Sequence, residues 1–308
     1  MERRLSSPAI DLSGSPARHR RERVIRGLFF GAAAFSVVIS AAIVLSLAGR
    51  AISFAIDVDP AALWSDGWFP RRGLYDLRTI VGGTLAVTLI SMLVATPLGL
   101  GAAIYLSEYA GPRARRWLKP VIEILAGIPS VVMGFFALAV VAPGLVQRVW
   151  SAAPLFTLMA AGIAVGILVT PLVASIAEDA MHAVPGSLRE ASVGLGARRM
   201  TTSLRVVFPA ALSGIVAALI VGISRAIGET MVVAMAAGGT GGAQGFGLLH
   251  PGQTMTGAMA SLATGSDQVK GAALTFEALF FVGMLLFLIT FALNVLSERF
   301  VRRFRNRY

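Results

Sequence analysis

The chain has 308 residues and a composition typical of a protein embedded in lipid. Apolar residues make up 56% and charged residues 14%, with a net charge of +11, 33 glycines and no cysteines. This composition excludes an ordinary soluble domain, and the lack of cysteine excludes disulfides, thiolate catalysis and cysteine metal sites.

Six uncharged apolar runs are each long enough to cross a bilayer as a helix, which takes about 17 to 25 residues. In chain order they are 27–49, 79–107, 124–147, 149–177, 206–224 and 278–297. These runs are apolar on every face, whereas the strands of a transmembrane barrel alternate apolar and polar residues. We therefore expect an all-α membrane protein with six transmembrane helices.

The distribution of basic residues predicts the orientation. With the N-terminus inside, cytoplasmic segments hold 20 of the 27 lysines and arginines, and external loops hold six. This orientation obeys the positive-inside rule, so we expect both termini in the cytoplasm. The basic excess is then mostly a topology signal, with some attraction to anionic lipid, and not a nucleic-acid surface.

Composition also divides the chain into segments. Residues 1–25 are polar and predict a flexible, basic cytoplasmic tail. We expect 26–50 to be the first transmembrane helix, left uncleaved, and 51–78 to be an external loop. The main transmembrane domain is expected at 79–297, followed by a second basic cytoplasmic tail at 298–308.

Motifs for catalysis or metal binding are not found in the sequence. The glycine-rich stretch 238–245 lacks the Gly-Lys-Ser/Thr ending of a phosphate-binding P-loop. The histidines, His19, His182 and His250, have no metal-ligand spacing. We predict no enzymatic activity, no metal and no cofactor in this chain, so another chain would supply the energy for any uphill work.

The segment 178–209 is the longest polar stretch that we expect to face the cytoplasm. It predicts two short helices around a turn at Pro185 and Gly186, with Ser187 and Glu190 at the spacing of a capping box. An amphipathic helix lying on the membrane surface would also fit these features.

A more specific pattern lies inside this segment. Glu190-Ala191-Ser192 is followed after three residues by Gly196, and nine residues later by Val206-Val207-Phe208-Pro209. The arrangement resembles the EAA loop of ABC-importer permeases, whose pattern is Glu-Ala-Ala, three residues, Gly, nine residues, Ile-x-Leu-Pro. Ser192, Val206 and Phe208 depart mildly from that pattern.

The resemblance implies a type I ABC importer permease fold, with 79–297 as the permease domain. It also implies that the loop is a cytoplasmic coupling helix that docks on an ATPase subunit. ATPase coupling is carried over to Glu190, Ala191 and Gly196, and to Arg198 and Arg199 as charged contacts at the rim.

Other stretches narrow the resemblance. "IEILAGIPSVVMGFFAL", "TPLVASIAEDAMHAVPGSLREAS" and "SRAIGETMVVAMAAGG" are similar to phosphate-importer permeases of the PstC type, over roughly residues 75–297. Sulfate and molybdate permeases share the EAA loop, but typically have Phe-Gly after the glutamate, where this chain has Thr230-Met231.

This resemblance implies ATP-driven phosphate import across a bacterial cell membrane by a multi-pass subunit. The implied partners are a second permease of the PstA type, an ATPase dimer of the PstB type that binds ATP and Mg, and an extracytoplasmic phosphate-binding protein of the PstS type. A related oxyanion importer, an ion-coupled secondary transporter and a membrane sensor remain alternatives. A secondary transporter should show repeated halves and has no use for an EAA loop.

Arg225 and Glu229 stand in an otherwise apolar stretch, where a charge costs between about 2.5 and more than 10 kcal/mol. In a continuous helix, residues four apart share one face about 6 Å apart along the axis. The pair is either an internal ion pair that ties helices together or part of the substrate pathway. In the second case the planar fork of Arg225 would match the oxygens of a tetrahedral oxyanion. Glu229 would then keep binding weak or accept a hydrogen bond from a protonated oxygen.

Small residues nearby predict close helix packing. Gly222 with Ala226 and Ser224 with Gly228 form two small-xxx-small pairs. In the third span, we expect Gly127 and Pro129 to break or bend the helix, and the resemblance makes this region pore-side architecture or a gate. Glu123 and Glu277 stand near the beginning of apolar runs and are expected at an interface.

Overall fold

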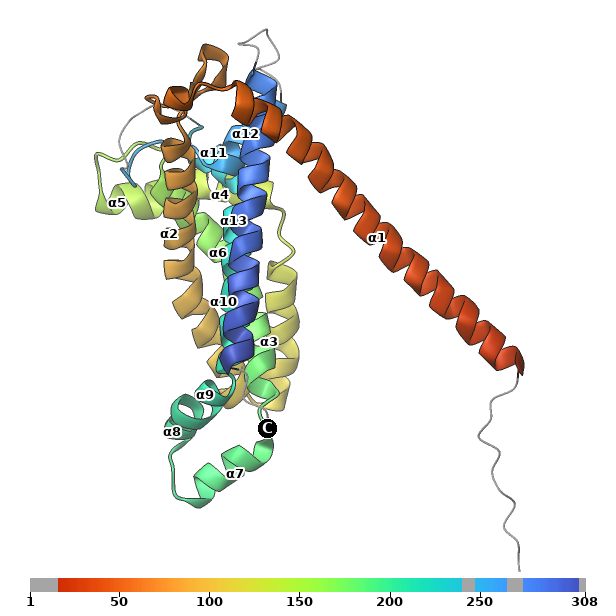
Figure 1. Cartoon of the computed structure of the whole chain (residues 1–308). Helices are drawn as coiled ribbons and strands as arrows, with labels where there is room; N and C mark the ends of the chain where they lie inside the picture. Colours follow the sequence, from red (N-terminus) through yellow and green to blue (C-terminus); the bar gives the residue numbers. More distant parts are fainter. Residues whose placement is uncertain (1–15, 240–246, 265–273, 305–308) are drawn as a thin grey trace, which may run out of the picture. The chain divides into compact units, whose positions relative to one another are not determined.

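The computed structural model describes residues 16–239, 247–264 and 274–304, and the chain forms two compact units, 1–49 and 50–308 (Figure 1). The first unit holds most of α1 (Pro16–Asp57), whose side chains from Arg20 to Gly49 are largely exposed. α1 begins at Pro16, ten residues before the expected start of the first transmembrane helix at residue 26. Residues 1–15 lie outside the described residues.

The second unit is helical apart from one short antiparallel pair of strands in the part of the chain that the structure describes. Trp68 pairs with Tyr75, and Phe69 with Leu74. Its elements after α1 are η1 (Pro60–Trp64), β1 (Trp68–Phe69), η2 (Pro70–Arg72), β2 (Leu74–Tyr75), α2 (Leu77–Ile104), η3 (Tyr105–Tyr109), α3 (Pro112–Leu125), α4 (Ser130–Phe136), η4 (Ala137–Val146), α5 (Gln147–Val149), α6 (Leu158–His182), α7 (Gly186–Gly194), α8 (Arg199–Thr202), η5 (Ser203–Val207), α9 (Phe208–Ala210), α10 (Leu212–Gly228), α11 (Met231–Ala236), α12 (Met255–Ala263) and α13 (Thr275–Phe304).

The all-α membrane class is confirmed. Among the described residues, five helices are long and apolar enough to cross a membrane, and six if one bent pair counts as a single span. That pair joins Arg199–Ala210 to Leu212–Gly228 with a bend of 73°. The location of the termini relative to the membrane stays a prediction.

The third and fourth spans begin later than the apolar runs predicted. The run from 124 is divided, because α3 ends at Leu125 and a new helix begins at Ser130. The interruption contains Gly127 and Pro129, the residues expected to break it. The fourth span begins at Leu158 and not at 149, and Thr157 caps it by accepting a hydrogen bond from the backbone N–H of Ala160 at 3.0 Å.

Helices α2 and α6 pack against each other at the centre of the second unit. A Cβ atom at Gly166 would lie 2.7 Å from Cβ of Val94, and one at Gly162 would lie 2.7 Å from Cβ of Ile90. Both glycines therefore allow the two backbones to approach closely. Buried apolar residues of α2, α4, α6 and α11 surround this contact and form the largest core of the unit.

Candidate functional site

The predicted coupling loop lies at one end of the second unit. Figure 1 shows α7, α8 and α9 at this end, while β1, β2 and α12 lie at the other. α7 begins at Gly186 after Pro185 at the N-cap, and no side chain caps it, so the expected capping role of Ser187 is wrong. The helix is followed by Gly196, whose φ of 81° is left-handed and favours glycine. The two short helices were expected on either side of Pro185 and Gly186, but the helix before that turn is the end of the long helix α6. The second short helix of the loop, α8, instead follows the turn at Gly196.

Arg189 holds α7 to the rest of the unit. Its Nη2 lies 2.9 Å from Oε1 of Glu108 in η3, the helical turn that continues α2. The same guanidinium donates hydrogen bonds to the backbone oxygens of Val184 at 2.6 Å and Met181 at 2.8 Å. One side chain therefore joins the coupling loop to the ends of both α2 and α6. Sequence reasoning missed this residue, because its acidic partner lies 81 positions away.

The residues predicted to contact an ATPase share the exposed surface of this loop. All five are exposed: Glu190, Ala191, Gly196, Arg198 and Arg199. Apolar side chains stand among them, and Leu195 is 90% exposed. Val193 and Met200 are also exposed. An apolar patch edged by charges is the usual composition of a surface that docks on another protein.

A cluster of charges ties α3 to α6 close to the loop. The side chain of Glu178 is fully buried, and its Oε2 lies 2.8 Å from Nζ of Lys119. Arg115 also pairs with Glu178, and Lys119 pairs with Asp179. Burial lowers the pKa of Lys119, but hydrogen bonds to Asp179 and Glu178 outweigh it, so the pKa is raised overall. The two cations compensate the negative charge of the buried Glu178 carboxylate.

The chain breaks between α10 and α11, and this changes the expected geometry of Arg225 and Glu229. α10 ends at Gly228, and Glu229 has extended dihedral angles, with φ of −69° and ψ of 123°. The expectation that the two residues share one helical face is therefore wrong. Thr256, at the start of α12, donates a hydrogen bond to the backbone oxygen of Glu229 at 2.8 Å. That bond satisfies a carbonyl that the break leaves without a helical partner.

The side chains of Arg225 and Glu229 differ in their surroundings. Arg225 is exposed in the last turn of α10, whereas Glu229 is only 9% exposed. No ion pair joins them in the described part of the chain. Next to Arg225, Ser224 donates a hydrogen bond to Oδ1 of Asn294 on α13 at 3.3 Å. Arg225 therefore occupies a face of α10 that the described residues leave uncovered.

The glycines of α10 also separate into two kinds. A Cβ atom at Gly222 would lie 2.9 Å from Cγ2 of Val173, so α10 packs closely on α6 there. At Gly228, nothing lies within 4 Å of such an atom. Close packing is thus present at Gly222, whereas no described residue packs against Gly228.

Glu123 and Glu277 are the remaining acidic residues singled out from the sequence. Glu123 is exposed on α3. Glu277 lies in the first turn of α13, and one of its carboxylate oxygens is buried with no hydrogen-bond partner in the part of the chain that the structure describes. Burial raises the pKa of the Tyr75 hydroxyl, and the charge of Glu277 raises it further. Neither acid lies beside Arg225 or Glu229 in the sequence, and we assign no transport role to them.

Comparison with known proteins gives consistent results over most of the chain. Residues 95–306 match the family model described as binding-protein-dependent transport system inner membrane component. The probable ABC transporter permease protein YqgH of Bacillus subtilis is 37% identical over 73% of this chain and 75% of its own length. The phosphate transport system permease protein PstC of Xylella fastidiosa is 31% identical over 78% of each chain.

A solved structure shares the fold. A chain of the MetNI methionine ABC transporter in an inward-facing conformation superposes with a TM-score of 0.56 at 20% identity. The match covers 73% of this chain and 94% of that one. At this level of identity, the likeness concerns the fold alone.

Proposed function

Because the chain belongs to the family of binding-protein-dependent transport system inner membrane components, with the fold of a type I ABC importer permease, we propose that it is the permease subunit of an ATP-driven phosphate importer. It is a multi-pass membrane protein by family and by its helices. Phosphate as the substrate is supported by the PstC proteins that it resembles, such as those of Xylella fastidiosa at 31% identity and Mycobacterium tuberculosis at 30%.

The exposed coupling loop is the observation that carries this proposal. Its apolar and charged residues face away from the bundle, while Arg189 fixes the loop to α2 and α6. A loop that is rigidly held and has an uncovered apolar surface suits the transfer of motion from an ATPase to membrane helices. The ATPase dimer, of the PstB type, would bind ATP and Mg and close and open beneath this loop.

We place a second permease, of the PstA type, against the uncovered face of α10. Arg225 and Gly228 are both exposed there. A cationic side chain within a span is costly in contact with lipid, and such residues usually face a bundle interior or a watery cavity. A pathway formed between two permeases would provide that environment. An extracytoplasmic phosphate-binding protein of the PstS type would deliver the substrate in a bacterial cell membrane.

In this pathway Arg225 would contact the passing oxyanion. Its planar guanidinium offers parallel N–H donors that match two oxygens of phosphate. The negative end of the α10 dipole lies beside it, because Arg225 is in the last turn. That dipole and Glu229 would prevent Arg225 from holding the anion too firmly, since conduction needs binding weak enough to reverse.

Transport by the whole complex tests the proposal. The chain would be assembled in proteoliposomes with its sister permease, ATPase and binding protein, and uptake of phosphate and sulfate would be measured with and without ATP. We expect phosphate uptake that depends on ATP. ATP-dependent uptake of sulfate but not phosphate would refute the assignment of phosphate as the substrate. Phosphate uptake without the ATPase would refute the assignment to an ATP-driven importer.

A further inference from the structure

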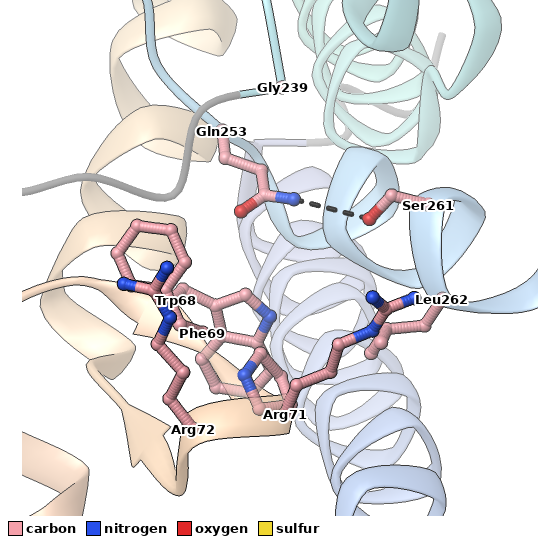
Figure 2. A pocket seen from close by; sticks show the side chains of 9 residues that line it. Trp68, Phe69, Arg71, Arg72, Gly239, Gln253, Ser261 and Leu262 are labelled. Atoms are coloured by element: carbon pink, nitrogen blue, oxygen red, sulfur yellow. Dashed lines mark hydrogen bonds between the residues drawn. The ribbon is translucent and has the colours of Figure 1, made fainter. Parts of the chain in front are cut away.

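A second polar site lies at the end of the unit opposite the coupling loop. A cavity of about 320 Å³ opens between the segment of β1 and η2 and the segment that leads into α12 (Figure 2). Trp68, Arg71 and Arg72 form one side, and Gln253 and Ser261 the other. The volume has room for a tetrahedral oxyanion together with part of its water, since one water occupies about 30 Å³.

Arg72 brings a positive charge to the lining of this cavity, and no acidic residue is among the described residues that line it. The guanidinium of Arg72 stacks over the ring of Phe69, with 5.4 Å between its central carbon and the ring centroid. Stacking on an aromatic face holds the planar group in a defined orientation while leaving its edge available to an anion.

Two buried polar atoms in the wall have no hydrogen-bond partner among the described residues. They are the indole nitrogen of Trp68, a donor, and Oε1 of Gln253, an acceptor. The residues are 3% and 5% exposed. Buried polar atoms are nearly always paired in folded proteins, so two that border one cavity indicate a ligand or ordered water that completes them.

The orientation of the Gln253 amide follows from its neighbour. The hydroxyl of Ser261 donates to the backbone oxygen of Ala258 at 2.9 Å, so its oxygen is left to accept. It accepts from Nε2 of Gln253 at 3.3 Å, as Figure 2 shows. Oε1 is therefore the end of the amide without a hydrogen-bond partner among the described residues. A ligand that pairs with it must donate a hydrogen bond. The cavity thus combines the guanidinium of Arg72 and an N–H donor with one fixed acceptor.

We propose that this cavity binds phosphate in a protonated form at the end of the permease opposite the coupling loop. The guanidinium of Arg72 and the indole N–H of Trp68 donate to the anionic oxygens, and Oε1 of Gln253 accepts from the P–OH group. Sulfate at neutral pH has no proton to donate, so its oxygen would face that of Gln253. A site with a buried acceptor rejects a ligand that leaves the acceptor unpaired. As a site on the import route, the cavity rests on the proposed function.

Equilibrium binding separates this inference from transport. Binding of radiolabelled orthophosphate and sulfate to the purified complex would be measured without ATP and without the binding protein. We expect phosphate to bind about tenfold more tightly than sulfate. Gln253→Met should abolish the preference by weakening phosphate alone, whereas Arg72→Gln should weaken both anions. Arg148→Gln, which removes an exposed arginine of α5 outside the cavity, is the matched control and should change neither.

A lipid headgroup offers similar chemistry, but a phosphodiester has no P–OH. The measurement would be repeated in nanodiscs with phosphatidylglycerol and with neutral lipid. Equal phosphate binding in both supports a site for the free ion, and loss of phosphate binding with phosphatidylglycerol would reassign the cavity to lipid. If Arg72→Gln and Gln253→Met bind and import phosphate with unchanged selectivity, the inference is wrong while the proposed function stands. Import of sulfate alone would refute the proposed function instead.

Discussion

Arg189 on α7 and Glu108 at the end of η3 form an ion pair, with Nη2 2.9 Å from Oε1, across 81 residues of sequence. The carboxylate of Glu108 is buried, and the guanidinium of Arg189 also donates hydrogen bonds to the backbone oxygens of Met181 and Val184. We therefore expect a movement of α7 to reach η3, which continues α2, and the end of α6 together.

Removing Arg189 should destabilise the protein and uncouple it. Arg189→Ala leaves Glu108 buried without its cation, which costs about 3 kcal/mol. Glu108→Gln should cost less, because Arg189 keeps both of its bonds to backbone oxygens. Thermal unfolding of the purified complex and the ratio of phosphate imported to ATP hydrolysed would be measured. Arg198 is in the same loop but exposed, so Arg198→Ala should leave the unfolding temperature unchanged. If Arg198→Ala lowered the unfolding temperature as much as Arg189→Ala, the anchoring role of Arg189 would be refuted.

The turn at Gly196 should tolerate substitution only by residues that accept a left-handed conformation. Gly196→Val should cost about 1 to 2 kcal/mol, and Gly196→Asn clearly less. No atom lies within 4 Å of an added Cβ atom, so the cost would come from the backbone alone. Gly194→Ala is the matched control, since Gly194 is equally open but lies within α7. Unfolding and ATPase activity would be compared, and equal effects of Val and Asn would contradict the explanation.

The exposed apolar surface of the loop should be needed for the ATPase partner and not for the fold. Leu195→Asp places a charge where the docked partner would have to desolvate it. We expect the ATPase to be lost from the complex during affinity purification, while the unfolding temperature of the permease changes little. Ser187→Asp adds the same charge to an exposed position on the first turn of α7 and should retain the partner. Retention of the ATPase by Leu195→Asp would count against docking at this surface.

Arg225 should matter for transport and not for stability. Arg225→Ala should reduce phosphate uptake by at least about tenfold, because a charge-assisted contact to the anion is lost. Arg225→Lys should keep only part of the rate, since lysine lacks the planar fork. The side chain is exposed and forms no ion pair with another described residue, so unfolding should be unaffected. Unchanged phosphate uptake by Arg225→Ala would remove this residue from the pathway.

Asp76 should make the stability of α2 dependent on acid. It caps the helix by accepting from the backbone N–H of Arg78 at 3.0 Å, and it accepts from Oγ1 of Thr79 at 2.6 Å. Burial raises its pKa, but hydrogen bonds from Thr79 and Arg78 outweigh burial and lower the pKa below the ordinary 3.8. The resulting stability is present above that ordinary value and is lost as pH falls through the lowered pKa.

The Asp76 contribution would be measured by unfolding between about pH 6 and pH 3. Asp76→Ala should cost about 1 kcal/mol at the upper end of this range. Asp76→Asn keeps an acceptor at the N-cap but has no carboxylate to protonate, so its difference from the native protein should shrink as the pH falls. A difference that grows on acidification would show that the sign is wrong.

Apolar composition predicted the membrane class, and the spacing from Glu190 to Pro209 indicated the loop. Both are local properties of the sequence. The break at Glu229 could not be found in this way, because no proline marks it and its carbonyl is satisfied by Thr256, 27 residues later. Arg189 was passed over for the same reason, since Glu108 is distant in sequence. By contrast, a local signal for the start of α6 is present in the sequence, because Thr157 is a residue type that commonly caps helices. The apolar run from 149 did not show this start, since apolar residues alone do not mark where a helix begins.

The close packing of α2 on α6 restricts how an access change could proceed. The side chains of Val94 and Ile90 lie against the backbone of Gly166 and Gly162, so sliding one helix along the other would press these side chains against neighbouring residues of α6. These two helices should therefore move as a single rigid strut, with a constant separation between probes placed on them. Opening and closing would have to take place around that strut, at the uncovered face of α10 and at the joint between α10 and α11.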